Sequence, residues 1–244
     1  SFSWTQGALS GIPAPTQWEV VVQLAGSATP AYDRAISNPR LLNIGELYTG
    51  LDSGTQYEYW VRSYCSPTDV SRWVKSPVFN TLCDPLDVPY QQAFNTTSDR
   101  TFCWSVINGG GNNAWTLNYA TTPIEGNQSA SFGPNNGTNN DDWLVSPTLN
   151  LLANYRMRFK YKVQNATGTA SANSIEIKLS TNGGSAVADF TETLMPARSF
   201  FNTQAQEMII YLTDYAGMPI NVGWHVVNGV TNNNRIYIDE VVFE

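Results

Sequence analysis

The chain has 244 residues, of which 14% are charged and 12% are aromatic, and its formal net charge is −7. A negative chain lacks the basic face that binding to nucleic acid or to an anionic membrane surface requires. No apolar run approaches the ~20 residues that span a bilayer, so membrane insertion is not expected. The length permits one large β domain or two ordinary ones, and the aromatic, turn-rich composition favours β structure.

Two strong strands are expected in the first eighty residues. The first runs from Trp18 to Leu24, and the second runs from Tyr57 to Tyr64. A turn at residues 66–69 would close a hairpin, and residues 73–81 would return as the last strand of the module. Because side chains alternate along a strand, one face of the second strand collects Tyr57, Tyr59, Val61 and Ser63.

The turn before the second strand carries a family resemblance. Its sequence, Leu51-Asp52-Ser53-Gly54-Thr55-Gln56-Tyr57, resembles the L-x-x-G-T-x-Y turn of fibronectin type III domains. The resemblance implies that the Tyr57 hydroxyl bonds back to nearby backbone. Ser1-Phe2-Ser3-Trp4 resembles the second strand of that family, which would leave the first strand missing and one sandwich edge uncovered. Residues 1–83 are therefore expected to form a truncated fibronectin type III sandwich.

The three cysteines are Cys65, Cys83 and Cys103. A bond between Cys65 and Cys83 is excluded, because the hairpin would place them about 30 Å apart, whereas a disulfide spans at most about 7 Å between Cα atoms. Cys83 and Cys103 lie on either side of the domain junction and could pair, since export favours oxidation. We expect Cys65 to be a free thiol, because its partner would lie in the missing strand. Three reduced thiols are the alternative.

Strands of period two dominate the rest of the chain. Residues 155–163 alternate fully, with Tyr155, Met157, Phe159, Tyr161 and Val163 on the inward face. The outward face is a row of four cations, which either belongs to a solvated strand or binds an acidic glycan: Arg156, Arg158, Lys160 and Lys162. Further strands are expected at 174–180, 207–212, 220–227 and 235–243, and no helical period of useful length occurs. These features predict an antiparallel sandwich.

The segment Asp141-Asp142-Trp143-Leu144-Val145-Ser146-Pro147-Thr148-Leu149-Asn150-Leu151 lies among these strands. It resembles the D-D-W-L-[IV]-S-P-x-[IL]-x-L signature of cleaved-adhesin or choice-of-anchor J domains, which are jelly rolls related in shape to MAM domains. Four other segments agree with that family: Cys103-Trp104-Ser105, Gln128-Ser129-Ala130, Arg158-Phe159-Lys160-Tyr161 and Ile236-Tyr237-Ile238-Asp239-Glu240-Val241. The resemblance implies an all-β chain in which residues 84–244 form an antiparallel jelly-roll sandwich.

Catalytic chemistry is not expected. His225 is the only imidazole, and no G-x-S-x-G or related nucleophile turn occurs. The acid pairs Asp141/Asp142 and Asp239/Glu240 could in principle hydrolyse a glycoside, but Asp239, Glu240 and Glu244 divide between the two faces of their strand. The sequence therefore predicts that the chain is not an enzyme.

A structural calcium ion is implied by the resemblance, since related jelly rolls join their first and last strands through one. Asp239 matches the acid of the closing strand, and Asn95 stands where the family has a glutamate. Calcium prefers several oxygen ligands from carboxylates, amides and carbonyls. The predicted ligands are thus Asn95 and Asp239, and the neutral amide should weaken the site.

A binding face would need aromatic rings that the core does not use. Trp104 and Trp143 lie in the family segments and are expected in the core, which leaves Trp115, Tyr119 and Trp224 as candidate platforms for a sugar.

The predicted function is non-catalytic. The chain would act in adhesion or ligand binding, toward an extracellular glycan or protein, as part of a longer precursor that Bacteroidetes-type bacteria secrete or anchor at the cell surface. The alternative is an accessory or spacer region of an exported hydrolase whose catalytic domain lies outside this chain. Neither the ligand nor the neighbouring domains follow from the sequence, because fold does not fix function.

Overall fold

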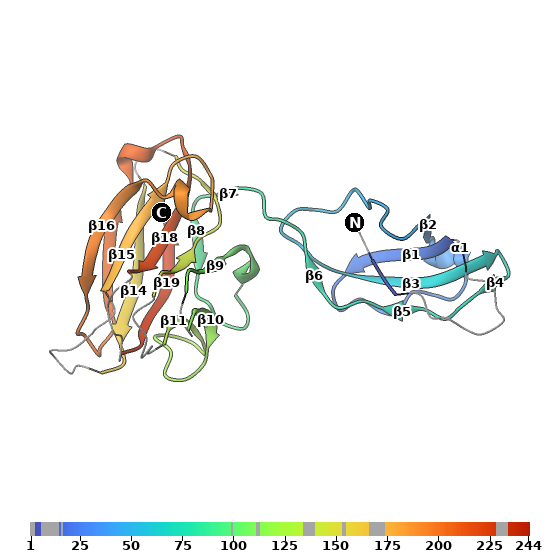
Figure 1. Cartoon of the computed structure of the whole chain (residues 1–244), viewed down its shortest axis with the longest axis horizontal. Coiled ribbons are helices and arrows are strands. Elements are labelled where there is room, and N and C mark those ends of the chain that lie inside the picture. The colour runs from blue at the N-terminus through green and yellow to red at the C-terminus, as the bar shows by residue number, and fades with distance from the viewer. Residues whose placement is uncertain are drawn as a thin grey trace. The chain divides into compact units, whose positions relative to one another are not determined.

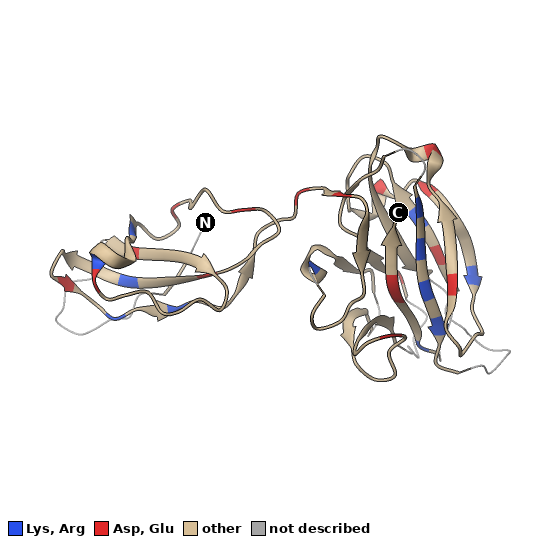
Figure 2. Ribbon diagram, turned by 180° about the vertical axis from the view of Figure 1, so that it is seen from behind, with Lys and Arg blue, Asp and Glu red and all other residues tan. Residues whose placement is uncertain are grey.

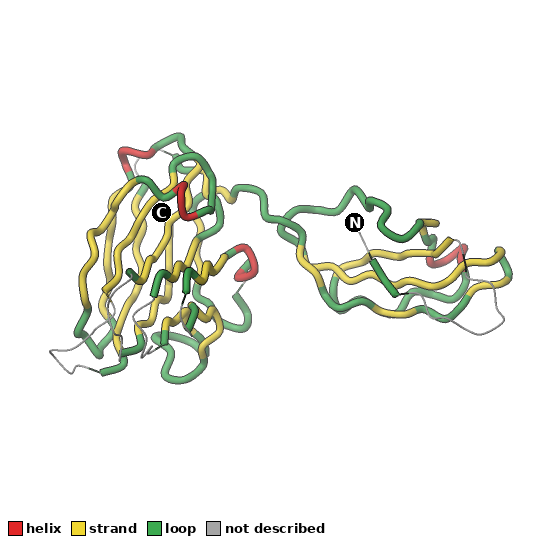
Figure 3. The backbone as a smooth tube through the Cα atoms, in the orientation of Figure 1, coloured by secondary structure: helices red, strands yellow, loops and turns green. Residues whose placement is uncertain are grey.

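Strands make up nearly all of the regular secondary structure of the described residues, as predicted, with short helical turns and many loops between them (Figure 3). The structure, a computed structural model, describes residues 3–5, 15, 17–98, 100–110, 113–133, 140–152, 155–165, 174–227 and 234–244. Contacts divide the chain into two compact units, Ser1–Cys83 and Asp84–Glu244, at the boundary that the sequence predicts. In the described ranges no helix is long and apolar enough to cross a membrane.

The described part of the N-terminal unit contains one antiparallel sheet, which we call the N-terminal sheet (Figure 1). The two central strands pair along eight residues, from Gln17 opposite Tyr64 to Leu24 opposite Tyr57. The strands follow the order β2-β1-β3-β4, and β5 and β6 also pair with β3. Their bounds are β1 (Gln17–Leu24), β2 (Arg40–Leu42), β3 (Gln56–Ser66), β4 (Asp69–Val70), β5 (Val74–Lys75) and β6 (Phe79–Asn80), and one helical turn, α1 (Arg34–Ser37), lies between β1 and β2.

The strand predicted at residues 73–81 is interrupted, and this part of the prediction is wrong. It forms the two short strands β5 and β6, separated by Ser76, Pro77 and Val78. Proline has no N–H to donate to the ladder. At the gap, the backbone N–H of Tyr59 donates to the Ser76 Oγ atom at 2.9 Å in place of a strand carbonyl.

The turn at residues 51–57 has the predicted hydrogen bond. The Tyr57 hydroxyl oxygen accepts a bond from the backbone N–H of Asp52 at 3.1 Å. Trp4 packs against Trp18, with ring centroids 5.7 Å apart, although residues 3–5 are not in a strand. Ser1 and Phe2 lie outside the described residues. The sheet and its turn agree with the fibronectin type III resemblance, and membership of that family stays a prediction.

Both faces of the N-terminal sheet are covered, which its alternating pattern does not predict. One face has an apolar core of Trp18, Val20, Leu42 and Val61. The opposite face buries the carboxylate of Glu19 and the guanidinium of Arg62, which meet at 2.7 Å. Arg34 forms a second ion pair with Glu19.

Two aromatic rings help to cover this charged pair. The Arg62 guanidinium lies 4.2 Å from the Trp73 ring centroid and 5.0 Å from that of Tyr32. Its Nη1 atom also donates to the Tyr32 carbonyl oxygen at 2.8 Å. The guanidinium of Arg62 thus contacts a carboxylate, a carbonyl oxygen and two aromatic rings, and a buried charge requires such partners.

Removing one member of this pair should unfold the N-terminal unit more readily. We expect Arg62→Ala to lower the free energy of unfolding by about 3–5 kcal/mol, because Glu19 would remain buried with only Arg34 as its partner. Arg72→Ala is the matched control, since Arg72 is exposed. Denaturant melts followed by tryptophan fluorescence would measure both variants. Equal stability of the two variants would show that the buried pair has no net role.

The C-terminal unit is a sandwich of two sheets (Figure 1). The first, called the β14 sheet, has the order β10-β11-β19-β14-β17, with β8 paired to β19. The second, called the β18 sheet, has the order β16-β15-β18-β12-β9, with β13 joining β18 to β7. The strands are β7 (Leu86–Asp87), β8 (Tyr90–Gln92), β9 (Ser105–Asn108), β10 (Trp115–Tyr119), β11 (Ser129–Phe132), β12 (Asp142–Val145), β13 (Leu149–Asn150), β14 (Arg156–Val163), β15 (Ser174–Ser180), β16 (Glu192–Ser199), β17 (Gln206–Tyr211), β18 (Pro219–Val226) and β19 (Ile236–Phe243).

Alternation along the strands creates the core between these sheets. On β14 the predicted inward residues are buried and the cations between them are half-buried. Trp224 on β18 is fully buried and meets Trp104 and Phe159, each with ring centroids 5.6 Å away. Such aromatic pairs add to the stability gained from burial itself. The predicted core position of Trp104 is confirmed.

Candidate functional site

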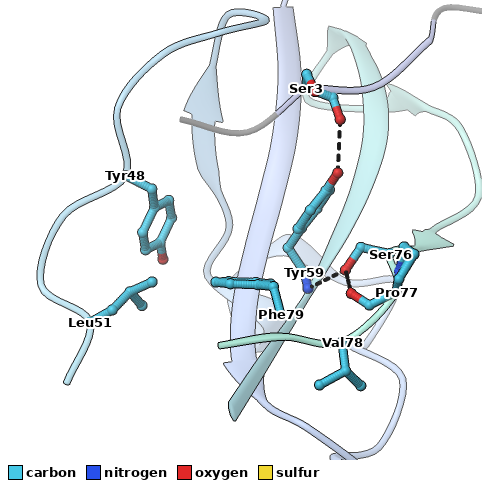
Figure 4. A pocket seen from close by; sticks show the side chains of 8 residues that line it. All are labelled: Ser3, Tyr48, Leu51, Tyr59, Ser76, Pro77, Val78 and Phe79. Atoms are coloured by element: carbon cyan, nitrogen blue, oxygen red, sulfur yellow. Dashed lines mark hydrogen bonds between the residues drawn. The ribbon is translucent and has the colours of Figure 1, made fainter. Parts of the chain in front are cut away.

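The described N-terminal unit contains a cavity of about 440 Å³ beside the apolar face of its sheet. Figure 4 shows Tyr48 and Leu51 on the segment before β3, facing Tyr59 and Phe79 across the space. The other described residues of the lining are Ser3, Ser76, Pro77 and Val78, and we call this space the aromatic pocket. Its volume lies within the range of about 300–1,000 Å³ that is usual for small-molecule sites.

Hydrogen bonds and ring contacts fix the walls of the aromatic pocket. The Tyr59 hydroxyl donates to the Ser3 carbonyl oxygen at 2.9 Å, and Ser76 Oγ donates to the Pro77 carbonyl oxygen at 2.8 Å. The Phe79 and Tyr59 ring centroids are 6.3 Å apart. On the far wall, the Arg40 guanidinium lies 4.3 Å from the centroid of the Tyr48 ring.

The described lining of the aromatic pocket consists of aromatic, aliphatic and hydroxyl side chains. Among the described residues, it contains no carboxylate, imidazole, ammonium or thiol group. None of the described lining residues could act as a base for its serine hydroxyls, and a hydroxyl nucleophile needs one. Aromatic rings with a few polar groups between them match the usual composition of small-molecule sites.

Two of the rings predicted as ligand platforms are buried. Trp115 is 4% exposed and Trp224 is 0% exposed, so neither ring can stack on a ligand. Both face the space between the two sheets, where the core uses them. Tyr119 is only partly buried, but the Arg235 guanidinium lies 3.9 Å from its ring centroid and covers one face of it. The pattern identified aromatic residues but not the face of the sheet on which each lies.

His225 is held between two carboxylates on the outer face of the β18 sheet. Its Nδ1 atom is 2.8 Å from the Glu176 Oε1 atom, and its Nε2 atom is 2.7 Å from the Asp141 Oδ1 atom. The ring also stacks on Trp143, with centroids 4.0 Å apart and planes 10° apart.

This arrangement supports a structural role for His225. The contacts of the described residues bring no hydroxyl or thiol nucleophile to its ring, so it lacks the arrangement of a nucleophilic triad. The predicted core residue Trp143 is buried, but it belongs to a second, smaller cluster with Val145 and Phe190. His225 closes one side of that cluster.

Asp142 is a buried acid next to this cluster. One of its carboxylate oxygens, Oδ2, accepts a bond from the Asp141 N–H at 3.3 Å, and Oδ1 has no partner among the described groups. Burial raises the pKa of the Asp142 carboxyl to about 6. Its ordinary value is about 4, so the folded state holds a proton that the unfolded state releases earlier.

The raised pKa of Asp142 predicts how stability depends on pH. Below about pH 4 the buried carboxyl of Asp142 is neutral and does not lower the free energy of unfolding. Stability is lost as the pH rises through about 6, because the buried carboxyl then ionises. We therefore expect Asp142→Asn to match the natural chain at pH 4 and to melt at a higher temperature at pH 8. Asp214→Asn makes the same change of charge at an exposed site. A gain for Asp142→Asn that is equal at both pH values would refute the explanation.

The two residues predicted to bind calcium, Asn95 and Asp239, hold a turn of the protein. Oxygen Oδ2 of Asp239 accepts bonds from the Ser129 hydroxyl at 2.8 Å and the Glu125 N–H at 3.2 Å, and Oδ1 accepts the Glu240 N–H at 2.9 Å. The Oδ1 atom of Asn95 accepts the Asn127 N–H at 2.7 Å. Both side chains thus bind the segment between β10 and β11.

These contacts do not fit a calcium shell. Hydrogen-bond donors already point at both carboxylate oxygens of Asp239 and at the amide oxygen of Asn95, where a cation would need them. In the part of the chain that the structure describes, no group of three or more His, Cys, Asp or Glu could hold a metal ion. Calcium stays a prediction from the family resemblance.

A melting experiment separates the two roles of Asp239. We expect equal melting temperatures in calcium and in chelator, because N–H and O–H donors take the place of the ion. Asp239→Ala should lower the free energy of unfolding by at least ~2 kcal/mol in both solutions, since several donors would lose their acceptor. A melting temperature that rises with calcium only when Asp239 is present would restore the metal site.

The four cations of β14 do not form an open basic patch. Figure 2 shows them as blue bands along one strand, with acidic residues on its neighbours. Arg156 pairs with Glu244 at 2.7 Å, Arg158 pairs with Glu207 at 3.2 Å, and Lys160 pairs with Glu125. Lys162 donates to the Pro123 carbonyl oxygen at 3.0 Å. The row is therefore compensated within the sheet, which favours the solvated strand over an acidic glycan site.

The cysteines have the predicted states. Cys65 is a free and exposed thiol. Cys83 and Cys103 are both disulfide-bonded. Disulfides persist in oxidising environments, so this state agrees with an exported protein.

Sequence reasoning did not find the aromatic pocket. Alternation groups Tyr59 with Tyr57, Val61 and Ser63 on one face of its strand, but Tyr48 and Leu51 lie in an irregular segment that has no periodic pattern. The sequence pattern does not identify which side chains line the space, because residues 48 and 79 approach each other only in the folded chain.

Comparisons with known proteins give similarity of structure only. No family model matches the chain, and no curated protein matches it. Among solved structures, the match with the K1 cleaved adhesin domain of Lys-gingipain from Porphyromonas gingivalis covers 64% of this chain and 98% of that domain, with 17% identity and a TM-score of 0.49. The K3 cleaved adhesin domain of the same protein covers 64% and 96%, with 19% identity and a TM-score of 0.47.

A structure of carbohydrate-binding modules from the β-sandwich superfamily is also similar. The match covers 93% of this chain and 84% of the other chain, with 10% identity and a TM-score of 0.46. With TM-scores below 0.5, these likenesses assign neither a family nor a ligand to this chain.

Proposed function

We propose that this chain is a non-catalytic binding module of a secreted or cell-surface protein, and that it recognises a glycan through the aromatic pocket. The observation that carries the proposal is the lining, in which the rings of Tyr48, Tyr59 and Phe79 border a space of about 440 Å³ and no described lining residue is an acid or a base. Flat rings offer apolar faces to the C–H groups of a sugar. Serine and backbone groups at the rim supply polar partners for its hydroxyls.

The rest of the chain supports binding without turnover. His225 is engaged by Asp141 and Glu176, and the acids Asp142 and Asp239 are buried. None of them lines the aromatic pocket. The disulfide-bonded state of Cys83 and Cys103 fits an oxidising compartment. An accessory region of an exported hydrolase could use the same pocket to hold substrate for a catalytic domain elsewhere.

Glycan binding is tested with the whole chain on a glycan array, followed by calorimetry with the best oligosaccharide. We expect Tyr48→Ala to weaken binding at least tenfold, which is about 1.4 kcal/mol, because it removes one wall of the pocket. Val78→Arg should have a similar effect, since Val78 belongs to the lining and is 52% exposed, so a longer, charged side chain there would change the edge of the pocket.

Tyr32→Ala is the control within the same unit. Tyr32 is 61% exposed and lies outside the lining, so its removal should change affinity less than twofold. Melting curves would establish that each variant is folded. Unchanged affinity in both pocket variants would place the ligand elsewhere, and the absence of any bound glycan would favour a protein ligand. Release of shorter sugars during the titration would contradict the non-catalytic assignment.

A further inference from the structure

The outer edge of β17 is the last edge of the β14 sheet. In the order β10-β11-β19-β14-β17, no described strand pairs with that side of β17. Unpaired strand edges present backbone donors and acceptors to any chain that can add a strand, and natural sheets usually protect them. The edge strand of the β18 sheet, β16, has such protection, and β17 lacks it.

The edge of the β18 sheet shows what that protection is. Its edge strand β16 contains Pro196 and Arg198, and its pairing with β15 shifts register twice. Proline and bulges make an edge a poor template. By contrast, β17 pairs with β14 without a shift, from Arg156 opposite Tyr211 to Tyr161 opposite Gln206, and its sequence contains neither proline nor glycine.

The hydrogen-bond pattern shows which residues of β17 face outward. The Leu212 N–H donates to the Tyr155 carbonyl oxygen at 2.9 Å, directly after the pair of Arg156 and Tyr211. In an antiparallel ladder, hydrogen-bonded and non-hydrogen-bonded pairs alternate. The backbone groups of Leu212, Ile210 and Met208 therefore point toward β14. Those of the residues between them point to the open edge: Glu207, Ile209 and Tyr211.

The same residues expose apolar side chains. Ile209 is 43% exposed and Tyr211 is 72% exposed on the outer face of the β14 sheet. Arg158, opposite Ile209 in the register, binds Glu207 at 3.2 Å. The edge thus presents an acid, a β-branched residue and an aromatic residue in that order, with basic residues behind them on β14.

This order is complementary to itself. If a second β17 pairs antiparallel about a two-fold axis at Ile209, then Ile209 meets its own copy and Glu207 lies opposite Tyr211 of the second copy. Arg156 stands behind each Tyr211 in the register, so each incoming Glu207 approaches a cation one strand away. No like charges meet across the join, and apolar side chains meet at its centre.

We propose that two copies of this chain associate through β17, joining their β14 sheets into one continuous antiparallel sheet. Each copy contributes the outward N–H and C=O groups of Glu207, Ile209 and Tyr211. The contact is a two-fold, isologous one, in which the same patch serves both partners. It involves one short strand per copy, so the area is small and the dimer is expected to be weak and dependent on concentration. A surface-anchored protein would meet that condition through its local density.

Light scattering after gel filtration tests the association with the whole chain. The natural chain should move from monomer toward dimer as the concentration rises, and Ile209→Lys should remain monomeric because it places two cations at the centre of the join. Val187→Lys is the matched control, since Val187 is an exposed β-branched residue of the same unit, 45% exposed, and should dimerise as the natural chain does. A natural chain that stays monomeric at every concentration would overturn the proposal.

Cross-linking tests the register in a Cys65→Ser background, which removes the exposed thiol. Ile209→Cys should form an intermolecular disulfide, because paired residues at the two-fold axis have Cα atoms about 5.5 Å apart. Tyr211→Cys should cross-link much less, since its copy lies several residues away. A dimer in which Tyr211→Cys cross-links and Ile209→Cys does not would refute this register. Either result leaves glycan binding in the N-terminal unit unaffected, so the two proposals can fail separately.

Discussion

The C-terminal unit depends on the burial of one face of each sheet against the other. Strands of period two place Met157, Phe159 and Trp224 between the sheets, where they are at most 1% exposed. Burial of such side chains stabilises by about 1.5–3 kcal/mol each, which no surface contact in this unit approaches. Because this burial fixes the inner residues, it also determines which residues remain on the outer faces. His225, the cations of β14 and Tyr211 lie where they do for that reason.

The N-terminal unit follows a different rule. One face of its sheet buries a charged pair, and the other face is covered by aromatic and aliphatic side chains. Glu19 and Arg62 are acceptable inside the fold because each charge has a partner and hydrogen bonds around it. On the apolar face, Trp4 and Tyr48 pack beside the core without forming strands. The irregular packing of that face leaves the space that we call the aromatic pocket.

Much of the fold could be predicted because period two is a strong signal. The strands at residues 155–163 and 174–180 followed from that period, whereas the boundary after Cys83 and the bond of Tyr57 followed from resemblances to known families. The split at Ser76 to Val78 did not, because a proline in a strand-like segment can mark either an edge or a break. The strand β16, with its two register shifts, has no clean alternation to predict it.

The site was harder to predict than the fold for a physical reason. Alternation separates the two faces of a strand but does not determine which face a neighbouring segment covers. Trp115 and Trp224 were therefore taken as candidate platforms, although they are buried. Glu19 and Glu58 were not recognised as buried, since their partners Arg62 and Lys75 lie on other strands. Contacts of this kind depend on tertiary structure and leave no local pattern.

The central claim is that the aromatic pocket is where the chain meets its ligand. Nuclear magnetic resonance measures this directly, by titrating the isotope-labelled whole chain with the oligosaccharide that binds most tightly and following each backbone amide. The largest shifts should cluster at Leu51, Tyr59, Ser76, Val78 and Phe79, around the lining of the cavity. Shifts confined to the C-terminal unit, for instance around His225 and Trp143, would contradict the account.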